Sequence, residues 1–225
     1  MLKKNKSLII KVLVSVTLLS IIFSRVDKEM FVNNFKLLDL RFAPVIILLL
    51  ISNYTLGAFR WKSLLIHDKE GKISVKYLIC LYFSGAFFNN FMPTSIGGDV
   101  YKVFKLGKKM DNTVDAFSAT FMERFTGVLA LIVISIVSLF DLIGIWSLAI
   151  LVLFIAGFFV GLYLLGFLSR KFKKLRKIYD SLIMYKGQGR VLFIAFITSF
   201  VIQFIAIFTQ YFVFLAIGEK LPLLY

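Results

Sequence analysis

The sequence predicts an all-α integral membrane protein, a polytopic helical bundle of about five to six spans with a re-entrant, Pro/Gly-broken segment near residues 77–98. Of the 225 residues, 60% are hydrophobic and the mean hydropathy is +0.89, whereas soluble domains are nearer 45–50% apolar. A chain of this size cannot bury so much apolar surface in a soluble core. The 27 Lys and Arg outnumber the 12 Asp and Glu, and they gather between the apolar runs, as topology requires in membrane proteins.

Composition also excludes other classes of protein. Cys80 is the only cysteine, so the chain is not a disulfide scaffold. Intrinsic disorder requires low hydrophobicity. The pI near 9.9 does not indicate nucleic acid, because the basic residues separate apolar spans. We expect one membrane domain over residues 1–225, since no Ser/Pro-rich linker interrupts it.

The first expected span, residues 7–24, follows a basic N-terminus. The run after Lys11 is as short as the core of a signal peptide, which leaves a cleaved signal as an alternative. No small-x-small cleavage site follows it, so a retained helix is favoured. Residues 25–41 carry apolar side chains at spacings of four and three, which predicts a helix lying along the membrane interface.

The second expected span covers residues 42–59 and ends in Arg60 and Trp61. An aromatic side chain beside a basic one at the end of a span is typical of an interfacial anchor. We therefore expect both side chains at headgroup depth.

Segment 77–98 begins apolar and ends in a series rich in Asn, Pro and Gly. Pro93 lacks an N–H group, and Gly97 and Gly98 can adopt backbone angles closed to other residues, so we expect them to break a helix. Non-helical backbone at membrane depth persists only inside protein or beside a wet cavity, where Asn89 and Asn90 would satisfy the freed backbone groups. The alternative is an ordinary span followed by a Pro/Gly loop outside the membrane.

Charge distribution favours the re-entrant alternative. With a cytoplasmic N-terminus and a re-entrant segment, the basic residues left outside are Arg25, Lys28, Lys36, Arg41 and Lys220. A full crossing would place the basic loop 169–190 outside, against the positive-inside rule. The sequence thus predicts a multi-pass protein of the cell (cytoplasmic) membrane.

The remaining expected spans are residues 114–140, 142–168 and 191–218. Gly157 and Gly161 form a small-residue pattern that lets helix backbones approach closely. A polar stripe on the last span predicts interhelical hydrogen bonds; it contains Ser199, Gln203 and Gln210.

Glu123 and Arg124 stand within an expected span, and an intramembrane charge indicates a functional site. Spacings of four and three place Glu123 on a face of small residues, with Arg124 about 100° away. The alternative places both charges at the interface and leaves a span of 125–140, which is short against the roughly 20 residues that a crossing needs.

A phosphate site is predicted where Arg124, Lys102 and Lys105 join the backbone N–H groups of Gly97 and Gly98. Asp99 would pair with Arg124, or it would cap the helix that follows. For the two lysines, the alternative is simple positive-inside anchoring.

Signs of enzyme chemistry are few. His67 is the only histidine, and the sequence contains no metal-ligand cluster, nucleophile–base pair or phosphate-binding loop. We therefore expect no catalytic residue, metal or cofactor.

Three segments carry a resemblance to a known family: AFRW (58–61), FNNFMPTSIGGDVYK (88–102) and ATFMERFTG (119–127). Together they resemble the lysylphosphatidylglycerol synthase transmembrane region, a flippase-like domain that also forms the membrane half of the bacterial multiple peptide resistance factor. The resemblance covers roughly residues 2–218. It implies that the chain binds and translocates a phospholipid or another lipid-linked substrate. Where this chain has Lys102, the family often has Arg.

Two features depart from the family pattern. The full factor carries a soluble domain that transfers lysine to phosphatidylglycerol, and members usually continue into a second membrane half; the sequence shows neither, so we expect a truncated member. A role in lipid aminoacylation and cationic-peptide resistance is one alternative function. A membrane scaffold for a separate transferase is another.

Overall fold

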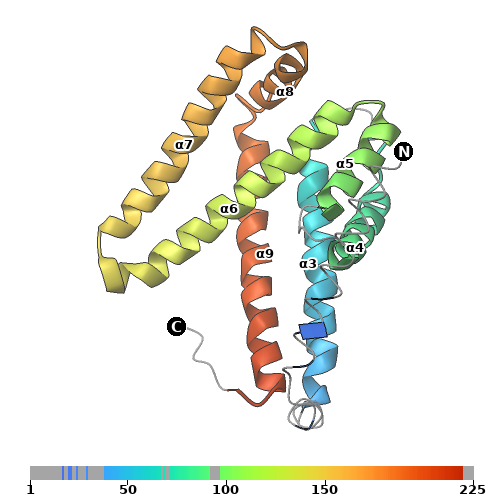
Figure 1. Ribbon diagram of the computed structural model, residues 1–225, viewed down its shortest axis with the longest axis vertical. Helices are drawn as coiled ribbons and strands as arrows, with labels where there is room; N and C mark the ends of the chain where they lie inside the picture. Colours follow the sequence, from blue (N-terminus) through green and yellow to red (C-terminus); the bar gives the residue numbers. More distant parts are fainter. Residues whose placement is uncertain are drawn as a thin grey trace.

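The computed structural model describes residues 38–219, except for 67, 69–70 and 92–96, together with isolated positions before residue 38. Within this part of the chain all regular secondary structure is helical (Figure 1), which confirms the predicted fold class. The elements are a 3-10 turn η1 (Leu40–Phe42) and the helices α3 (Ala43–Leu64), α4 (Val75–Phe91), α5 (Gly97–Met110), α6 (Thr113–Ile143), α7 (Trp146–Ser169), α8 (Lys173–Ile183) and α9 (Gly189–Ala216).

Four segments of the described chain are long and apolar enough to cross a bilayer: Leu40–Leu64, Thr113–Ser138, Leu148–Ser169 and Gly189–Ala216. The expected span 7–24 and the interfacial helix over 25–41 lie almost entirely outside the described residues. Pro93 also lies outside them.

Helices α3 and α9 run antiparallel and side by side through most of their length (Figure 1). The amide of Asn53 donates to the carbonyl oxygen of Ile202 at 3.3 Å, and the backbone N–H of Asp39 donates to the carbonyl oxygen of Ala216 at 2.8 Å. Helix α6 crosses this pair at an angle. Helix α7 turns back from the end of α6 and lies outside the α3–α9 pair. The turn from α6 to α7 passes through Gly144 at φ +55°, a backbone angle that glycine adopts without strain.

Helices α4 and α5 form a hairpin that returns to the end of the bundle where it began (Figure 1). Near that end, the hydroxyl of Tyr77 donates to the carbonyl oxygen of Lys105 at 3.3 Å. At the far end of the hairpin, the N–H of Gly98 donates to the side-chain oxygen of Asn89 at 2.7 Å. Neither helix is among the four candidate spans. The hairpin thus extends from Val75 to Met110, and its returning arm is α5, most of which lies beyond the predicted bounds of 77–98. Lys102 accordingly stands within the hairpin and not in a loop that follows it.

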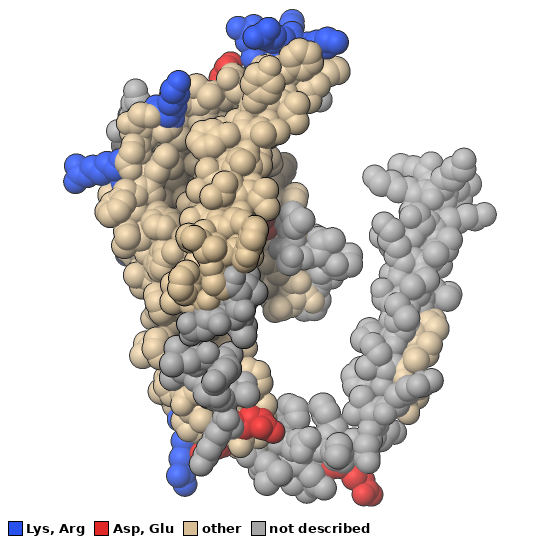
Figure 2. All heavy atoms as spheres, turned by 90° about the vertical axis from the view of Figure 1, so that its left-hand side faces the viewer, with Lys and Arg blue, Asp and Glu red and all other residues tan. Residues whose placement is uncertain are grey.

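We call one end of the bundle the basic end; it comprises the end of α3, the starts of α6 and α9, and α8. Figure 2 shows Lys and Arg gathered at this end on the face it presents. Of the described Lys and Arg, Arg41 alone lies near the opposite end, at the start of α3. A one-sided distribution is what the positive-inside rule predicts for a membrane bundle.

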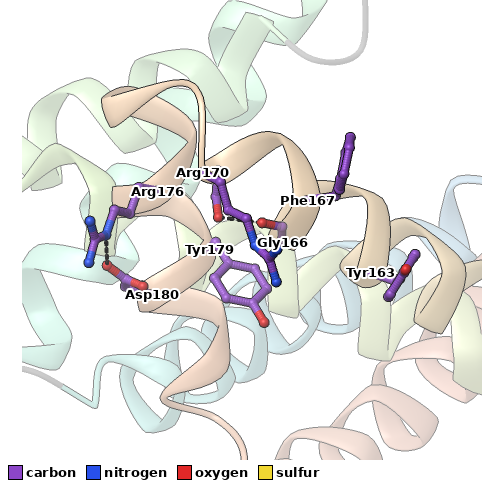
Figure 3. Close-up of a pocket in the computed structure, with 8 residues that line it drawn as sticks. Tyr163, Gly166, Phe167, Arg170, Arg176, Tyr179 and Asp180 are labelled. Carbon is purple, nitrogen blue, oxygen red and sulfur yellow. Dashed lines mark hydrogen bonds and ion pairs between the residues drawn. The ribbon is translucent and has the colours of Figure 1, made fainter.

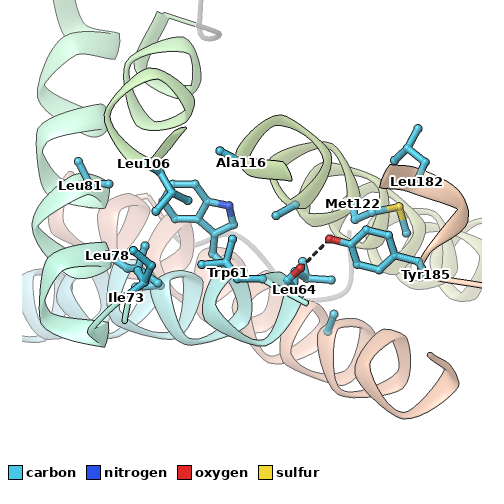
Figure 4. Packing of buried hydrophobic residues seen from close by; sticks show 14 residues of the cluster. Trp61, Leu64, Ile73, Leu78, Leu81, Leu106, Ala116, Met122, Leu182 and Tyr185 are labelled. Carbon is cyan, nitrogen blue, oxygen red and sulfur yellow. Dashed lines mark hydrogen bonds between the residues drawn. The ribbon is translucent and has the colours of Figure 1, made fainter. Parts of the chain in front are cut away.

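The hydrophobic core lies near the basic end (Figure 4). Trp61, Leu64, Leu78 and Leu106 are fully buried there. The hydroxyl of Tyr185 donates to the carbonyl oxygen of Leu64 at 2.6 Å and joins α3 to the α8–α9 connection. This core holds the α4–α5 hairpin against α3 and α6, and so positions the side chains described next.

Helix α7 contributes little to the core, because none of the residues in its most apolar window is buried. A Cβ atom added at Gly157 or Gly161 would meet nothing within 4 Å. The close helix approach predicted for these glycines is therefore not made within the described part of the chain.

Candidate functional site

Helix α6 turns Glu123 inward and Arg124 outward. As the spacing predicted, Glu123 lies on a buried stripe with small and polar side chains: Ala116, Thr120 and Ala130. Glu123 is 3% exposed, whereas the side chain of Arg124 is 59% exposed. The two neighbours therefore belong to different environments, as expected from the 100° turn between successive helical residues.

Glu123 is the centre of a buried ion cluster built by four helices. Its Oε1 atom accepts from Nη2 of Arg60 at 2.8 Å and from the hydroxyl of Tyr82. Its Oε2 atom lies 3.7 Å from Nζ of Lys102. A carboxylate this deep in a helical bundle requires such partners, because an unpaired buried charge is strongly destabilising.

Lys102 is shared by two carboxylates and two aromatic rings. Its Nζ atom lies 3.1 Å from Oδ1 of Asp99, 4.0 Å from the ring centroid of Tyr82 and 5.0 Å from that of Trp61. The residue is 4% exposed. Lys102 therefore mainly neutralises the interior of the site, and only a small part of its side chain is open to a ligand.

Arg60 extends the cluster to α9. Its Nη1 atom donates to Oγ of Ser199 at 2.8 Å, and Ser199 also lies 3.3 Å from the hydroxyl oxygen of Thr126. Gln203 donates to the carbonyl oxygen of Gly127 at 3.3 Å. The predicted interhelical bonds from the polar stripe of α9 are thus made by Ser199 and Gln203.

Arg60 and Trp61 do not form the predicted interfacial anchor. Arg60 is 8% exposed and Trp61 is fully buried. The motif of a basic residue beside an aromatic one does not reveal which face of the helix meets lipid. Here Arg60 is the counter-ion of Glu123, and Trp61 forms part of the core.

Arg124 and Asp99 form the outer part of the site. Nε of Arg124 donates to Oδ2 of Asp99 at 2.7 Å, which realises the predicted pair. The side chain of Asp99 is 13% exposed, so most of the accessible surface of the pair belongs to the guanidinium group of Arg124. Of the three basic side chains at the site, Arg60, Lys102 and Arg124, it is Arg124 that is most open to a ligand.

A cavity of about 190 Å³ lies against this pair, between α3, α4, α5 and α6. We call it the polar cavity; it is lined by Tyr54, Tyr82, Gly85, Ala86, Asn89, Asn90, Gly98, Asp99, Lys102 and Arg124. Six residues predicted for the site are therefore brought together. Gly97 and Gly98 do not take the special backbone angles predicted for them: they are the buried first two residues of α5 and neither has a positive φ. Lys105 is exposed and lies over the ring of Tyr101 at 5.7 Å.

A second hollow adjoins the polar cavity on the outer side of α5 and α6. This apolar groove measures about 650 Å³, and Asp99 and Arg124 line both spaces. Its other lining is mainly Val100, Val103, Phe104, Phe117 and Phe121. The Asp99–Arg124 pair thus stands where a polar space meets an apolar one.

Sequence reasoning missed Arg60 and Tyr82 as partners of Glu123. It also did not name Tyr54, Gly85 and Ala86, which line the polar cavity. Arg60 directly follows the second expected span and had no assigned partner. A charge at membrane depth indicates that an oppositely charged partner is nearby, and this could have identified Arg60. Tyr82 carried no signal in its sequence context. Among the described residues, no three His, Cys, Asp or Glu side chains are grouped so that they would hold a metal ion.

Comparison with curated proteins and with solved structures gives no match. A family model described as the lysylphosphatidylglycerol synthase TM region matches residues 8–225. Among the motif residues that suggested this family, six line the polar cavity: Asn89, Asn90, Gly98, Asp99, Lys102 and Arg124. Two more, Arg60 and Glu123, pair beside it. The chain therefore belongs to the lysylphosphatidylglycerol synthase TM region family.

Proposed function

We propose that this chain binds an anionic phospholipid, or a lipid-linked substrate with a phosphate, at Arg124 and moves it between the leaflets of the cell membrane. The observation that carries the proposal is the exposure of Arg124 within a spanning helix. Arg124 is the twelfth residue of α6, roughly 16 Å along the axis from its first residue. An arginine facing hydrocarbon near the centre of a span costs about 2.5–3.5 kcal/mol, so an exposed one favours an anionic ligand.

The two adjoining spaces match the two parts of a lipid. The polar cavity offers the amides of Asn89 and Asn90 beside the guanidinium group. The apolar groove begins at the same guanidinium and is lined by valine and phenylalanine side chains. A phosphate on Arg124 would thus have its polar substituent in the cavity and an acyl chain in the groove.

Asp99 supplies an exchange partner for the guanidinium group. Arg124 is paired with Asp99 at 2.7 Å, which lowers the cost of holding the cation in the membrane. When a phosphate binds Arg124, Asp99 keeps its second partner, Lys102, at 3.1 Å. The Asp99–Arg124 pair can therefore open and re-form while each of the two charges keeps an oppositely charged partner.

The proposal also specifies which end of the bundle faces the cytoplasm. The basic end would face the cytoplasm, because loops rich in Lys and Arg are retained there. The α4–α5 hairpin would then enter from the cytoplasmic leaflet, and the polar cavity would collect lipid from that leaflet.

Lipid translocation by reconstituted vesicles tests the function. We expect wild-type protein to move fluorescent phosphatidylglycerol between leaflets and Arg124→Ala to move it at least about tenfold more slowly, because a charge-assisted contact to phosphate is worth about 1.5–3 kcal/mol. Bleaching of the outer-leaflet probe with a membrane-impermeant reductant reports the rate.

The matched control is Lys108→Ala, which removes one exposed cation from the end of α5, outside both spaces. It should translocate lipid at the wild-type rate. Equal rates for Arg124→Ala and wild type would show that Arg124 is not the headgroup site, and no transport by wild-type protein would refute translocation.

A further inference from the structure

A second polar hollow lies at the basic end, between the end of α7 and α8 (Figure 3). This α7–α8 cavity measures about 670 Å³, and its lining includes Arg170, Arg176, Tyr163 and Tyr179. It shares no residue with the polar cavity or with the apolar groove at Arg124. It is therefore independent of the site proposed for translocation.

The α7–α8 cavity continues into a separate apolar space. This inner groove measures about 710 Å³ and runs between α6, α7 and α9 beneath α8. Tyr163 and Tyr179 line both spaces. Much of the inner groove is aromatic, with Phe125, Phe158 and Phe196 among its lining residues.

Two local features shape the place where these spaces adjoin. A Cβ atom at Gly166 would lie 3.0 Å from the ring of Tyr179, so glycine allows that ring to pack on α7. Helix α8 is amphipathic, with Leu182 buried and Arg176 and Lys177 exposed. Such a helix lies at the headgroup boundary, its apolar side toward the acyl chains.

We propose that this second site binds an anionic phospholipid, with its phosphate between Arg170 and Arg176 and its acyl chains in the inner groove. The order of the two spaces supports a lipid as the occupant. Cationic side chains lie at the basic end, tyrosines stand at the junction and phenylalanines line the deeper part, which is the order of polarity across one leaflet.

Charge also favours an anionic headgroup. Arg170, Arg176 and Lys186 line the two spaces, against Asp180 as the carboxylate. Asp180 lies 3.9 Å from Arg176, and the side chains of the two are 65% and 74% exposed. An exposed pair at that distance contributes little, so Arg176 exchanges Asp180 for a phosphate at small cost. A zwitterionic headgroup also brings a phosphate, but its cationic group would be repelled by the same arginines, so a headgroup of net negative charge gains more from this arrangement.

Photolabelling of the purified full chain in detergent micelles tests the proposal. The probe is phosphatidylglycerol with a diazirine in one acyl chain, and labelled peptides are identified by mass spectrometry. We expect labelling of α6, α7 and α9 around Phe125, Phe158 and Phe196, competed by unlabelled phosphatidylglycerol at about tenfold lower concentration than by phosphatidylcholine.

The charge-deficient variant is Arg170→Ala/Arg176→Ala, which should lose about tenfold or more of this labelling. Its control, Lys171→Ala/Lys177→Ala, removes the same charge from exposed positions that do not line the cavity and should label like wild type. Both pairs are exposed, so folding is preserved, which one elution volume for all three proteins would verify.

Three results would overturn the proposal. Equal competition by the two lipids would show that the groove takes lipid without regard to charge. An equal loss of labelling in both double variants would show that the protein's net charge, and not Arg170 and Arg176 in particular, attracts the lipid. Failure of the probe to label the groove in any protein would show that another segment or chain covers it. Lipid translocation by Arg124 is measured separately, and these results leave it unaffected.

Discussion

At the residue scale, two adjacent charges in one helix have opposite tasks. Glu123 is buried and binds Arg60 and Tyr82, while Arg124 faces the polar cavity and the apolar groove. The difference arises from the 100° rotation between neighbours on a helix. We therefore expect Glu123 to stabilise the helical bundle, whereas Arg124 forms part of the proposed ligand site.

Glu123→Gln tests the structural task. The substitution keeps the size of the side chain but replaces one acceptor oxygen by an NH2 donor. It leaves Arg60 and Lys102, which are 9% and 5% exposed in their side chains, without their shared anion. Loss of one partner from a buried ion cluster costs about 3–5 kcal/mol. We expect a clearly lower thermal unfolding midpoint in detergent.

Asp180→Asn is the control for this measurement, because its side chain is 65% exposed and exposed ion pairs contribute little. Its unfolding midpoint should stay near that of the wild type. An unchanged midpoint for Glu123→Gln would contradict a stabilising role for the buried cluster.

At the scale of elements, the α4–α5 hairpin depends on a close contact between two helix backbones. A Cβ atom at Gly98 would lie 2.2 Å from the carbonyl oxygen of Gly85. A backbone atom cannot move aside as a flexible side chain does. Because α5 carries Asp99 and Lys102 to the site, the contact also sets the geometry of the polar cavity.

Gly98→Ala should therefore separate the two helices. We expect a loss of about 1–3 kcal/mol or more in unfolding free energy, as for overpacked cores, and a matching fall in lipid translocation. Thermal unfolding in detergent and the vesicle assay measure the two effects.

Gly157→Ala is the matched control, since an added Cβ at that position on α7 meets nothing within 4 Å. Alanine should be neutral or slightly favourable there, because glycine in a helix interior costs up to about 1 kcal/mol relative to alanine. If Gly98→Ala left stability unchanged or raised it, as expected for Gly157→Ala, the close contact between the backbones of α4 and α5 would be contradicted.

At the scale of the whole molecule, the path of the hairpin decides which loops share a side of the membrane. The end of α5, the whole of α8 and the start of α9 lie at the basic end, whereas the α6–α7 turn lies away from it, toward the opposite end (Figure 1). Had segment 77–98 crossed the bilayer, the end of α5 and the end of α3 would lie on opposite sides.

Single cysteines test this arrangement in a Cys80→Ala background. Lys108→Cys and Lys177→Cys should react with an impermeant maleimide from the same side, and Ile145→Cys, which is 72% exposed in the α6–α7 turn, should react from the other. Sealed vesicles labelled before and after lysis distinguish the sides. Labelling of positions 108 and 177 from opposite sides would exclude the re-entrant hairpin.

The amino-acid sequence by itself determined the class of fold, the buried stripe of α6 and the candidate residues around Asn89, Asp99 and Arg124, because hydropathy, helical spacing and charge are local properties. Tertiary structure alone decided that Arg60 is the counter-ion of Glu123, that Trp61 lies in the core and that Lys105 lies away from the site. Each of these depends on which helix faces which, and a partner 63 residues away in the chain leaves no mark on the local pattern. The same packing places Asp99 and Arg124 at the boundary between a polar and an apolar space.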